Sequence, residues 1–408
     1  MELSPVSHCD GSETSHRSTL VNKAPLLTNQ FTNGRSDQKK AKAVSDAIDK
    51  CLRAEKERQH KDGGIKLLIL GPSETGKTTV LKQLKLLYGT RGLDAERQTY
   101  RRVVYLNVMR AIQAIVVGLK LANIELEKPE NVDHLEVLSR LEPTLKRYSI
   151  SELGYTNPAI PRKITDAKAE TDMFAEMVPA IKALWSDAGI QTTFTTCTQL
   201  NIQDSAKYFL DAVDRIADPE YVPTDDDILQ ARVRTLVVSE HIFNIDNVAY
   251  RIFDVGGQKS LRKYWAPYFD DVNAIIFMAA LSAYDQPCED DPGLNRLQEC
   301  MLLFNEIANH KLFALTSMIL FLNKIDIFQR KLEAGSLVST HFPEYRGPND
   351  YFSTTVFFQY RFLQQCKDLQ KQVYTHFTHA TDTNQMRVIV VAVNAIVQRL
   401  NLRSSGLM

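Results

Sequence analysis

Residues Ile65–Tyr88 read IKLLILGPSETGKTTVLKQLKLLY. The stretch opens with an apolar run of strand length, Ile65–Leu70, and continues after Lys77 with apolar residues at three- and four-residue spacing, which predicts an amphipathic helix packed on a sheet. Between them, residues 71–78 match the phosphate-binding pattern G-x-x-x-x-G-K-[ST]. A chance match in a chain of this length has odds of roughly one or two in a hundred. The stretch therefore predicts a nucleotide-binding loop between a strand and a helix.

This position explains how the loop would bind phosphate. Glycines let the loop turn its backbone N–H groups inward, and the helix N-terminus adds partial positive charge. In such a loop Lys77 reaches the β- and γ-phosphates, and Thr78 offers its hydroxyl to Mg²⁺.

Composition limits the class of protein. The 408 residues suffice for two domains or one large domain with an insertion, and 49 basic residues balance 49 acidic ones, so nothing suggests a nucleic-acid partner. No apolar run reaches the ~18 residues of a membrane span, and no secretory signal opens the chain, so we expect any membrane contact to be peripheral. The cysteines show no C-x-x-C spacing, which indicates a reducing, cytosolic setting; they are residues 9, 51, 197, 288, 300 and 366.

The residue pattern in the rest of the sequence predicts a helical insertion followed by the remaining strands of the sheet. Residues 1–36 are polar and predicted to be disordered, and a polar helix is predicted over residues 37–62, which either lies on a partner or is a solvated lead-in. A mostly helical tract follows the phosphate loop, with helices predicted over 103–123, 172–188 and 204–216 and a surface loop over 142–168. Strands are predicted over 236–243, 248–253, 274–281 and 318–322, with helices near 294–310 and 382–402. This alternation predicts a largely parallel sheet covered by helices, with the hairpin from Leu236 to Phe253 adding one antiparallel edge strand.

Two further motifs follow predicted strands. Asp254, in the segment DVGGQ, could hold Mg²⁺ through water; Gly257 would let the backbone approach a γ-phosphate, and Gln258 could orient a water. Alone, such a segment is a commonplace tight turn. Further on, in the segment FLNKID (residues 321–326, with Asn323, Lys324 and Asp326), the Asp326 carboxylate can accept two hydrogen bonds from guanine that adenine cannot offer. The lysine stem can pack on the base.

Taken together, these segments resemble the α subunits of heterotrimeric G proteins. The resemblance covers about residues 40–408 in order, through GxxETGKT, IKALW at 181–185, DSAKY at 204–208, YVPT at 221–224, RVRT at 232–235, DVGGQ, FLNKID and THATDT from 378, with Tyr374 before it. It implies an α/β fold: a Ras-like P-loop GTPase domain with a six-stranded, mostly parallel sheet, over residues 63–92 and 230–408. An all-α helical domain is then inserted over residues 93–229.

The resemblance also assigns residues. Arg232 matches a built-in arginine that stabilises transition-state charge and Glu74 the loop glutamate that pairs with it, so Gln258 and Arg232 are the implied catalytic residues. Thr78 and Thr235 are the implied Mg²⁺ ligands, and residues 378–380 the loop beneath guanine. The implied nucleotide site comprises Glu74, Thr75, Gly76, Lys77, Thr78, Thr79, Asp204, Ser205, Leu229, Arg232, Thr235, Asp254, Gly257, Asn323, Lys324, Asp326 and Ala380.

Several positions depart from the family pattern. Ser73 replaces a glycine and could crowd Gln258, and His379 replaces a cysteine. Leu236-Val237 replace Thr-Gly, while Leu261 and Tyr264 replace charged residues. These departures leave hydrolysis rate, effector choice and β/γ pairing open.

Both ends of the chain also differ from the family pattern. Glu2 stands where N-myristoylation needs glycine, so Cys9 is the candidate acylation site near the start, giving marginal anchoring alone. No cysteine stands four residues from the end, which excludes ADP-ribosylation there.

The resemblance implies a slow GTPase switch that binds GTP or GDP with Mg²⁺ and relays a signal from a G-protein-coupled receptor, contacted through the C-terminal helix. Implied partners are a β/γ dimer, a GTPase-accelerating regulator and an effector, of which adenylate cyclase is one candidate. The implied location is the cytoplasmic face of the plasma membrane and the cytoplasm. Two alternatives stay open: a GTP-binding scaffold with little hydrolysis and altered or no β/γ coupling, motivated by Ser73 and the altered switch residues, and a P-loop ATPase or kinase, which Asn323, Lys324 and Asp326 argue against.

Overall fold

A computed structural model describes residues 64–404 except 91, 95, 141–166, 197–201, 237, 289–290, 292 and 369. The predicted disordered segment 1–36, the helix 37–62, the candidate acylation site Cys9 and all but the last two residues of the loop 142–168 lie outside the described residues.

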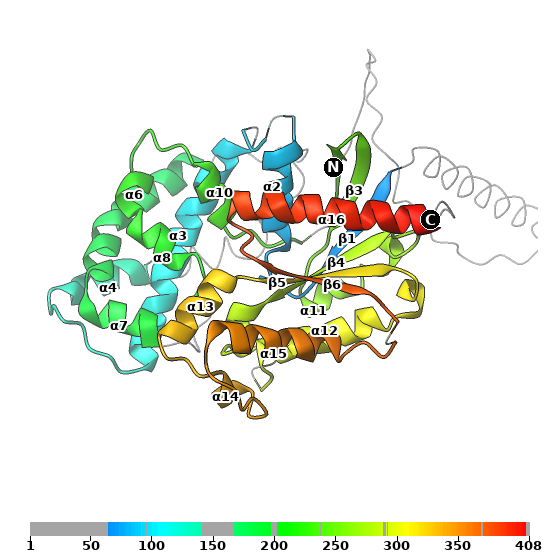
Figure 1. Cartoon of the computed structure of the whole chain (residues 1–408). Helices are drawn as coiled ribbons and strands as arrows, with labels where there is room; N and C mark the ends of the chain where they lie inside the picture. Colours follow the sequence, from blue (N-terminus) through cyan, green and yellow to red (C-terminus); the bar gives the residue numbers. More distant parts are fainter. Residues whose placement is uncertain are drawn as a thin grey trace, which may run out of the picture. The chain divides into compact units, whose positions relative to one another are not determined.

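A six-stranded sheet forms the centre of the described chain, with strand order β2-β3-β1-β4-β5-β6 (Figure 1). The edge strand β2 pairs antiparallel with β3, and all other pairings are parallel. The predicted parallel sheet with one antiparallel edge strand is thus confirmed. The strands are β1 Ile65–Leu70, β2 Ser239–Ile245, β3 Val248–Asp254, β4 Ala274–Ala280, β5 Ser317–Asn323 and β6 Val373–Thr378.

Two details of the sheet differ from the prediction. The strand predicted from Leu236 begins at Ser239, because Thr235 is held at the phosphate loop and the chain reaches the sheet only after it. The position of strand β6 was not predicted from the residue pattern, although the resemblance implied six strands, because its sequence VYTHFT has no apolar run and only its last residue is buried. The hairpin turn agrees with its sequence, since Asp246 and Asn247 adopt φ of 50° and 63°, as a two-residue turn requires.

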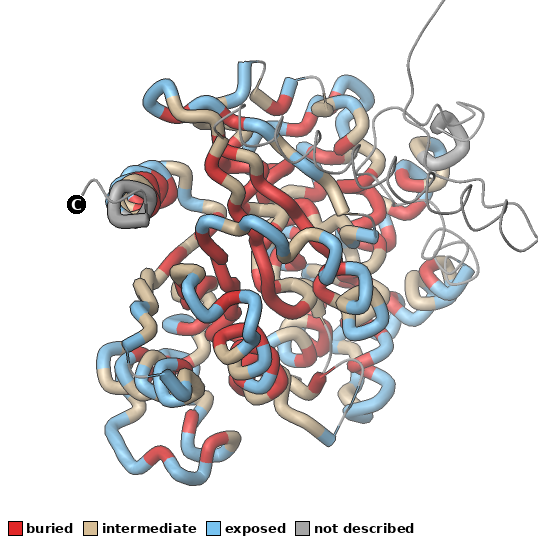
Figure 2. Tube along the Cα trace, turned by 90° about the vertical axis from the view of Figure 1, so that its right-hand side faces the viewer, coloured by how far each residue is buried: buried red, intermediate tan, exposed pale blue. Residues whose placement is uncertain are grey.

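Helices cover both faces of the sheet, because alternate strand residues point to opposite sides. On one face, Leu67 and Ile69 of β1 share a core with α2 (Lys77–Tyr88) and α16 (Thr383–Ser404). On the other, Leu68 and Leu70 share a core with the helices α12 Arg296–Ala308, α13 Ile325–Glu333 and α15 Tyr351–Leu363. Figure 2 shows the buried residues concentrated along the strands between these layers. Short elements complete this part: α11 Lys259–Arg262, η2 Ala266–Tyr268, η3 Leu281–Ala283, η4 Lys311–Phe313 and α14 Val338–His341.

The helical tract between α2 and β2 has its own apolar core around α3 (Arg97–Leu121). Helix α3 is long and apolar enough to cross a membrane, but 72% of its most apolar window is buried among the other helices, as in a core helix. The predicted helix 204–216 is two short helices. The remaining helices are α4 Asn131–Ser139, α6 Ala167–Trp185, α7 Ala188–Thr196, α8 Ala206–Asp211, α9 Val213–Ile216 and α10 Asp225–Gln230.

A buried carboxylate holds the last helix of this tract in place. Asp227 of α10 is fully buried and accepts hydrogen bonds from Arg215 at 2.7 and 2.8 Å and from Tyr208 and Tyr221 at 2.9 Å each. Burial alone would raise the pKa of Asp227, but these hydrogen bonds, with one from the backbone of Thr224, hold it below its ordinary value. The helix that leads into Arg232 is therefore firmly anchored to the helical core.

Candidate functional site

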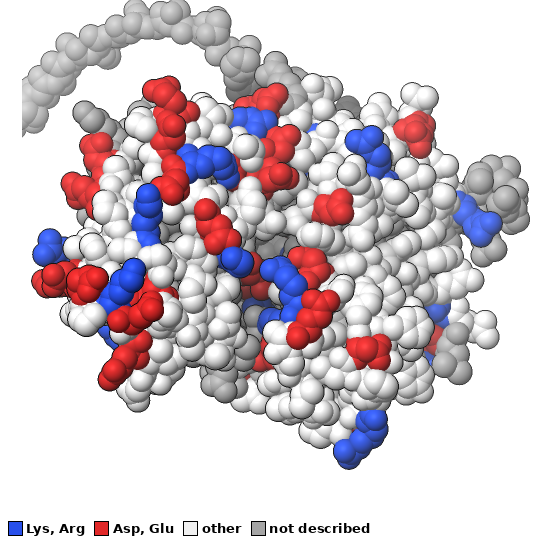
Figure 3. Space-filling model, turned by 60° about the vertical axis from the view of Figure 1, so that its left-hand side comes forward, with Lys and Arg blue, Asp and Glu red and all other residues white. Residues whose placement is uncertain are grey.

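A cavity of about 470 Å³ lies where the helical tract meets the ends of the strands, within the size range of small-molecule sites. Figure 3 shows a recess in this face of the molecule with charged side chains of both signs around it. Two residues of the predicted site, Thr75 and Asp254, are buried and do not line the cavity. The other predicted residues line it: Glu74, Gly76, Lys77, Thr78, Thr79, Asp204, Ser205, Leu229, Arg232, Thr235, Gly257, Gln258, Asn323, Lys324, Asp326 and Ala380.

The phosphate loop has the backbone geometry that its sequence predicts. Gly71 and Gly76 adopt φ of 142° and 98°, which side chains disfavour, and α2 begins directly afterwards. A Cβ on Gly76 would lie 2.3 Å from Asn323 Nδ2, so only glycine fits there. Lys77 Nζ lies inside the loop and donates to the carbonyls of Gly71 at 3.0 Å and Pro72 at 2.7 Å. Burial lowers the pKa of Lys77 to about 8.

The DVGGQ segment closely approaches this loop. A Cβ on Gly257 would lie 2.5 Å from Lys77 Nζ and from the carbonyl carbon of Pro72, so glycine is required for the approach. Gln258 follows on the cavity wall. The segment is therefore placed beside the position of a terminal phosphate in a nucleotide bound by the loop.

Three oxygen-bearing side chains meet at the start of α2. Thr78 Oγ1 lies 2.9 Å from Thr235 Oγ1 and donates to Asp254 Oδ2 at 2.9 Å, and Thr235 Oγ1 lies 3.4 Å from the same carboxylate oxygen. Asp254 is 1% exposed, burial raises its pKa, and its Oδ1 has no hydrogen-bond partner among the described residues. Hydroxyl and carboxylate oxygens beside a phosphate position fit Mg²⁺, which uses few protein ligands and completes its shell with phosphate and water.

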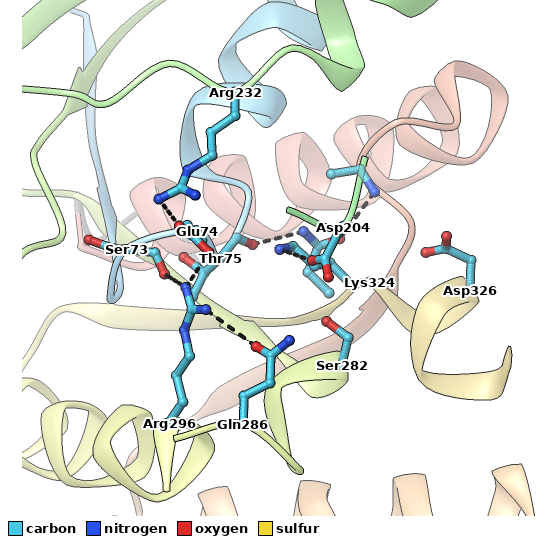
Figure 4. A network of polar contacts seen from close by, with 12 residues as sticks. Ser73, Glu74, Thr75, Asp204, Arg232, Ser282, Gln286, Arg296, Lys324 and Asp326 are labelled. Carbon is cyan, nitrogen blue, oxygen red and sulfur yellow. Dashed lines mark hydrogen bonds and ion pairs between the residues drawn. The ribbon is translucent and has the colours of Figure 1, made fainter. Parts of the chain in front are cut away.

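The loop glutamate contacts two arginines (Figure 4). Glu74 forms the ion pair with Arg232 that the resemblance implies. Its other oxygen accepts from Arg296 Nη2 at 2.7 Å, and that guanidinium also donates to the Ser73 carbonyl at 3.1 Å. Sequence reasoning missed Arg296, because it stands at the start of α12, 222 residues from Glu74, and no motif marks it.

At the other end of the cavity, Asn323 connects three loops. Its Nδ2 donates to the Thr75 carbonyl at 2.8 Å, and its Oδ1 accepts from Thr378 Oγ1 at 2.9 Å and from the Ala380 backbone at 3.1 Å. The side chain is 1% exposed. Asn323 therefore fixes the phosphate loop relative to the THATDT loop.

An ion pair joins the two sides of the cavity at this end. Lys324 Nζ lies 2.5 Å from Asp204 Oδ2, and Asp204 precedes α8 in the helical tract (Figure 4). Burial alone would raise the pKa of Asp204, but the charge and hydrogen bond of Lys324 hold it below its ordinary value. The Asp204 carboxylate therefore stays charged at neutral pH, and the pair joins the helical tract to the segment after β5 on the cavity wall.

The proposed base-selecting carboxylate is more open. The Asp326 side chain is 28% exposed, and its Oδ2 lies 3.4 Å from both Arg330 Nη2 and His379 Nε2. His379 Nε2 also lies 2.8 Å from Thr381 Oγ1. The contact of His379 with Asp326 was not predicted, because the two residues stand in separate segments, one after β5 and the other after β6.

Two other departures from the family pattern are exposed near the phosphate end. Leu236 is 37% and Tyr264 56% exposed. Leu261 instead packs against the backbone, because a Cβ on Gly256 would lie 2.5 Å from Leu261 Cδ1.

Comparison with known proteins agrees with this geometry. Residues 42–397 match the model of the G-protein alpha subunit family. The chain is 38% identical over 370 residues to the guanine nucleotide-binding protein alpha-1 subunit of Mycosarcoma maydis, and 39% identical over 373 residues to a G-protein complex alpha subunit of Aspergillus fumigatus. Each alignment covers 91% of this chain and 98% of the relative. The chain therefore belongs to the G-protein alpha subunit family.

Proposed function

We propose that this G-protein alpha subunit hydrolyses GTP with Arg232 and Gln258 as catalytic residues and with Mg²⁺ held by Thr78 and Thr235. As a family member the chain is a guanine-nucleotide-dependent GTPase switch in signal transduction. The observation that carries the residue assignment is the cluster of Thr78, Thr235 and Asp254 beside the phosphate loop, with Arg232 held at Glu74 on the same cavity wall.

In this proposal each group has one task. Gln258 orients a water whose oxygen attacks the γ-phosphorus while the bond to the β–γ bridging oxygen breaks, giving GDP and phosphate. Lys77 and the Arg232 guanidinium meet the negative charge that develops on the phosphoryl oxygens. Bound Mg²⁺ would neutralise charge on the β- and γ-phosphates. To reach the γ-phosphate, Arg232 must leave or share its ion pair with Glu74. Arg296 still pairs with the Glu74 carboxylate when Arg232 moves.

The base end would select guanine. Asp326 would accept from the N1–H and the exocyclic amine, and the site would reject adenine because adenine leaves those acceptors unpaired. Asp204 and Lys324 would close over the nucleotide.

The direct test compares GTP with ATP binding and then measures single-turnover hydrolysis with Mg²⁺ and with EDTA. We expect binding of GTP and not ATP, and slow hydrolysis that EDTA abolishes. Equal binding of ATP would contradict guanine selection. Tight GTP binding with no hydrolysis above the uncatalysed rate would favour the scaffold function instead.

For partners, we propose a β/γ dimer, a G-protein-coupled receptor contacted through α16, a GTPase-accelerating regulator and an effector, with adenylate cyclase as the first effector to test. G-protein alpha subunits generally partner with β/γ dimers and receptors. Helix α16 supports a contact surface, because Val388 and Val391 are 70% and 59% exposed. Binding of a purified β/γ dimer to the wild type and to Tyr264→Lys tests whether the altered residue weakens that contact.

We also propose that the protein is found in the cytoplasm and, peripherally, on the cytoplasmic face of the plasma membrane, with Cys9 as an acyl site. One acyl chain gives only marginal anchoring, so part of the protein should sediment with membranes and that part should fall in Cys9→Ser. Equal fractionation of the two forms would assign the anchoring to partner proteins.

A further inference from the structure

One side chain from the helical tract forms hydrogen bonds with both the N–H and the carbonyl of Arg232. Asn107 of α3 accepts from the Arg232 N–H at 2.9 Å through Oδ1 and donates to the Arg232 carbonyl at 3.1 Å through Nδ2. The same Nδ2 donates to the Val103 carbonyl, one turn earlier in α3, at 2.7 Å. Asn107 is 1% exposed.

Through these hydrogen bonds, the position of α3 determines the position of the Arg232 backbone. The Asn107 amide bonds both backbone groups of Arg232, so it fixes that residue as pairing with a neighbouring strand would. The hydrogen bond from Asn107 to the Val103 carbonyl orients the amide itself. Breaking these buried hydrogen bonds would leave polar groups without partners, which lowers the free energy of unfolding. Because α3 is the centre of the helical core, Arg232 is placed by that core rather than by the sheet.

A second buried side chain holds the residues just before Arg232. Lys82 of α2 donates to the carbonyls of Ile228 and Ala231 at 2.8 Å each and is 3% exposed. Helix α2 also carries Lys77 at its start. The segment 228–232 is thus held between the helix that begins at the phosphate loop and the central helix of the insertion.

We propose that Asn107 is a positioning residue for GTP hydrolysis: it holds the Arg232 backbone so that the guanidinium reaches the γ-phosphoryl group. This inference rests on the proposed catalytic role of Arg232. A long, flexible side chain can stabilise a transition state only if its base is fixed, and a displacement of about 1 Å can cost about 100-fold in rate. Asn107 does not line the cavity, so it would act only through Arg232.

A purely structural role makes a different prediction. If Asn107 only satisfied hydrogen bonds in the helical core, its loss would lower thermal stability and leave the hydrolysis rate of the GTP-loaded protein unchanged. Ile115 provides the matched control, since it is fully buried in α3 two turns further on and is remote from the Arg232 backbone by the rise of the helix.

The experiment measures single-turnover phosphate release from GTP-loaded, full-length protein, together with GTP affinity and thermal midpoint. The variants are Asn107→Ala, the isosteric Asn107→Asp, Ile115→Ala, Arg232→Cys and Asn107→Ala with Arg232→Cys. Asn107→Asp keeps the shape and the acceptor for the Arg232 N–H but loses the donor to the Val103 and Arg232 carbonyls, so it tests the donated hydrogen bonds separately. We expect both Asn107 variants to slow hydrolysis by about 10- to 100-fold with GTP affinity retained, and Ile115→Ala to lower the thermal midpoint without changing the rate.

The double variant decides how Asn107 acts. If it acts through Arg232, Asn107→Ala should have no further effect on hydrolysis in the Arg232→Cys background. An equal loss in both backgrounds, a wild-type rate in both Asn107 variants, or loss of GTP affinity alone would each overturn the inference. If Arg232→Cys itself hydrolyses at the wild-type rate, the proposed function of Arg232 fails, which is a distinct outcome.

Discussion

The two ends of the cavity are built differently. At the phosphate end, Lys77 at the start of α2 and Asp254 at the end of the central strand β3 are 5% and 1% exposed. At the base end, the side chains of Asp326 and His379 are 28% and 32% exposed, and closure depends on the ion pair of Lys324 with Asp204 of the helical tract. One end is held by the core of the sheet, whereas the other is held by a contact between distant parts of the chain.

This difference suggests a division of labour. Catalysis needs groups fixed in advance, which burial next to paired strands supplies. Nucleotide exchange needs a contact that can open, and an ion pair between two separate cores can do so without unfolding either. We therefore expect changes at the phosphate end to alter hydrolysis and changes at the base end to alter nucleotide affinity and release.

The largest effect should come from removing the catalytic groups at the phosphate end. Gln258→Leu and Arg232→Cys should each slow hydrolysis by about 10³-fold or more, because water orientation or charge stabilisation is lost, and should leave GTP binding intact. Single-turnover phosphate release and equilibrium GTP binding measure the two properties. If either variant lost GTP affinity in proportion to rate, the two ends would not be separable.

At the base end, Asp326→Asn should weaken GDP and GTP binding by about 100-fold or more and shift preference toward xanthine nucleotides, because the amide no longer accepts both guanine donors. Binding of GTP and XTP to wild type and variant measures this shift. Hydrolysis of whatever GTP is bound should continue at the wild-type rate. A variant with wild-type GTP affinity would refute the assignment of this loop.

A gain in rate is expected at Ser73. Its side chain lies in the phosphate loop where Gln258 must approach, so Ser73→Gly should speed hydrolysis by about tenfold. The backbone bond from Arg296 to residue 73 would be kept, since it uses the carbonyl. Ser73→Ala is the control. Its hydrolysis should remain slow if the Cβ of residue 73 is the obstacle, and should become faster if the hydroxyl group is the obstacle. No change in the glycine variant would exclude crowding.

The smallest effect should follow from opening the ion pair across the cavity. Asp204→Asn should speed GDP release by about fivefold, equivalent to about 1 kcal/mol for a partly exposed pair, with hydrolysis unchanged. Asp214→Asn is the matched control, because Asp214 pairs with Lys182 at 2.5 Å within the helical tract and does not line the cavity. Equal GDP release from both variants would mean that the pair does not control opening.

The local sequence predicted the structure best where function depends on neighbouring residues. The phosphate loop, DVGGQ and FLNKID each lie at the carboxyl end of a strand, and the loop geometry of Gly71 and Gly76 is as expected. It did not predict strand β6, whose polar residues show no strand pattern. It also placed the start of β2 too early, because Thr235 contacts Thr78 and the chain joins the sheet only at Ser239.

From the sequence alone, the strand–loop–helix unit, the class of nucleotide and the chemical types at each end of the cavity were determined, because these depend on short segments whose local geometry follows from residue type. The tertiary structure alone brought Arg296 to Glu74, Lys324 to Asp204 and Asn107 to Arg232. These partners are separated by 222, 120 and 125 residues. No local pattern encodes such pairs, because the partners stand far apart in the sequence and meet only when the chain has folded.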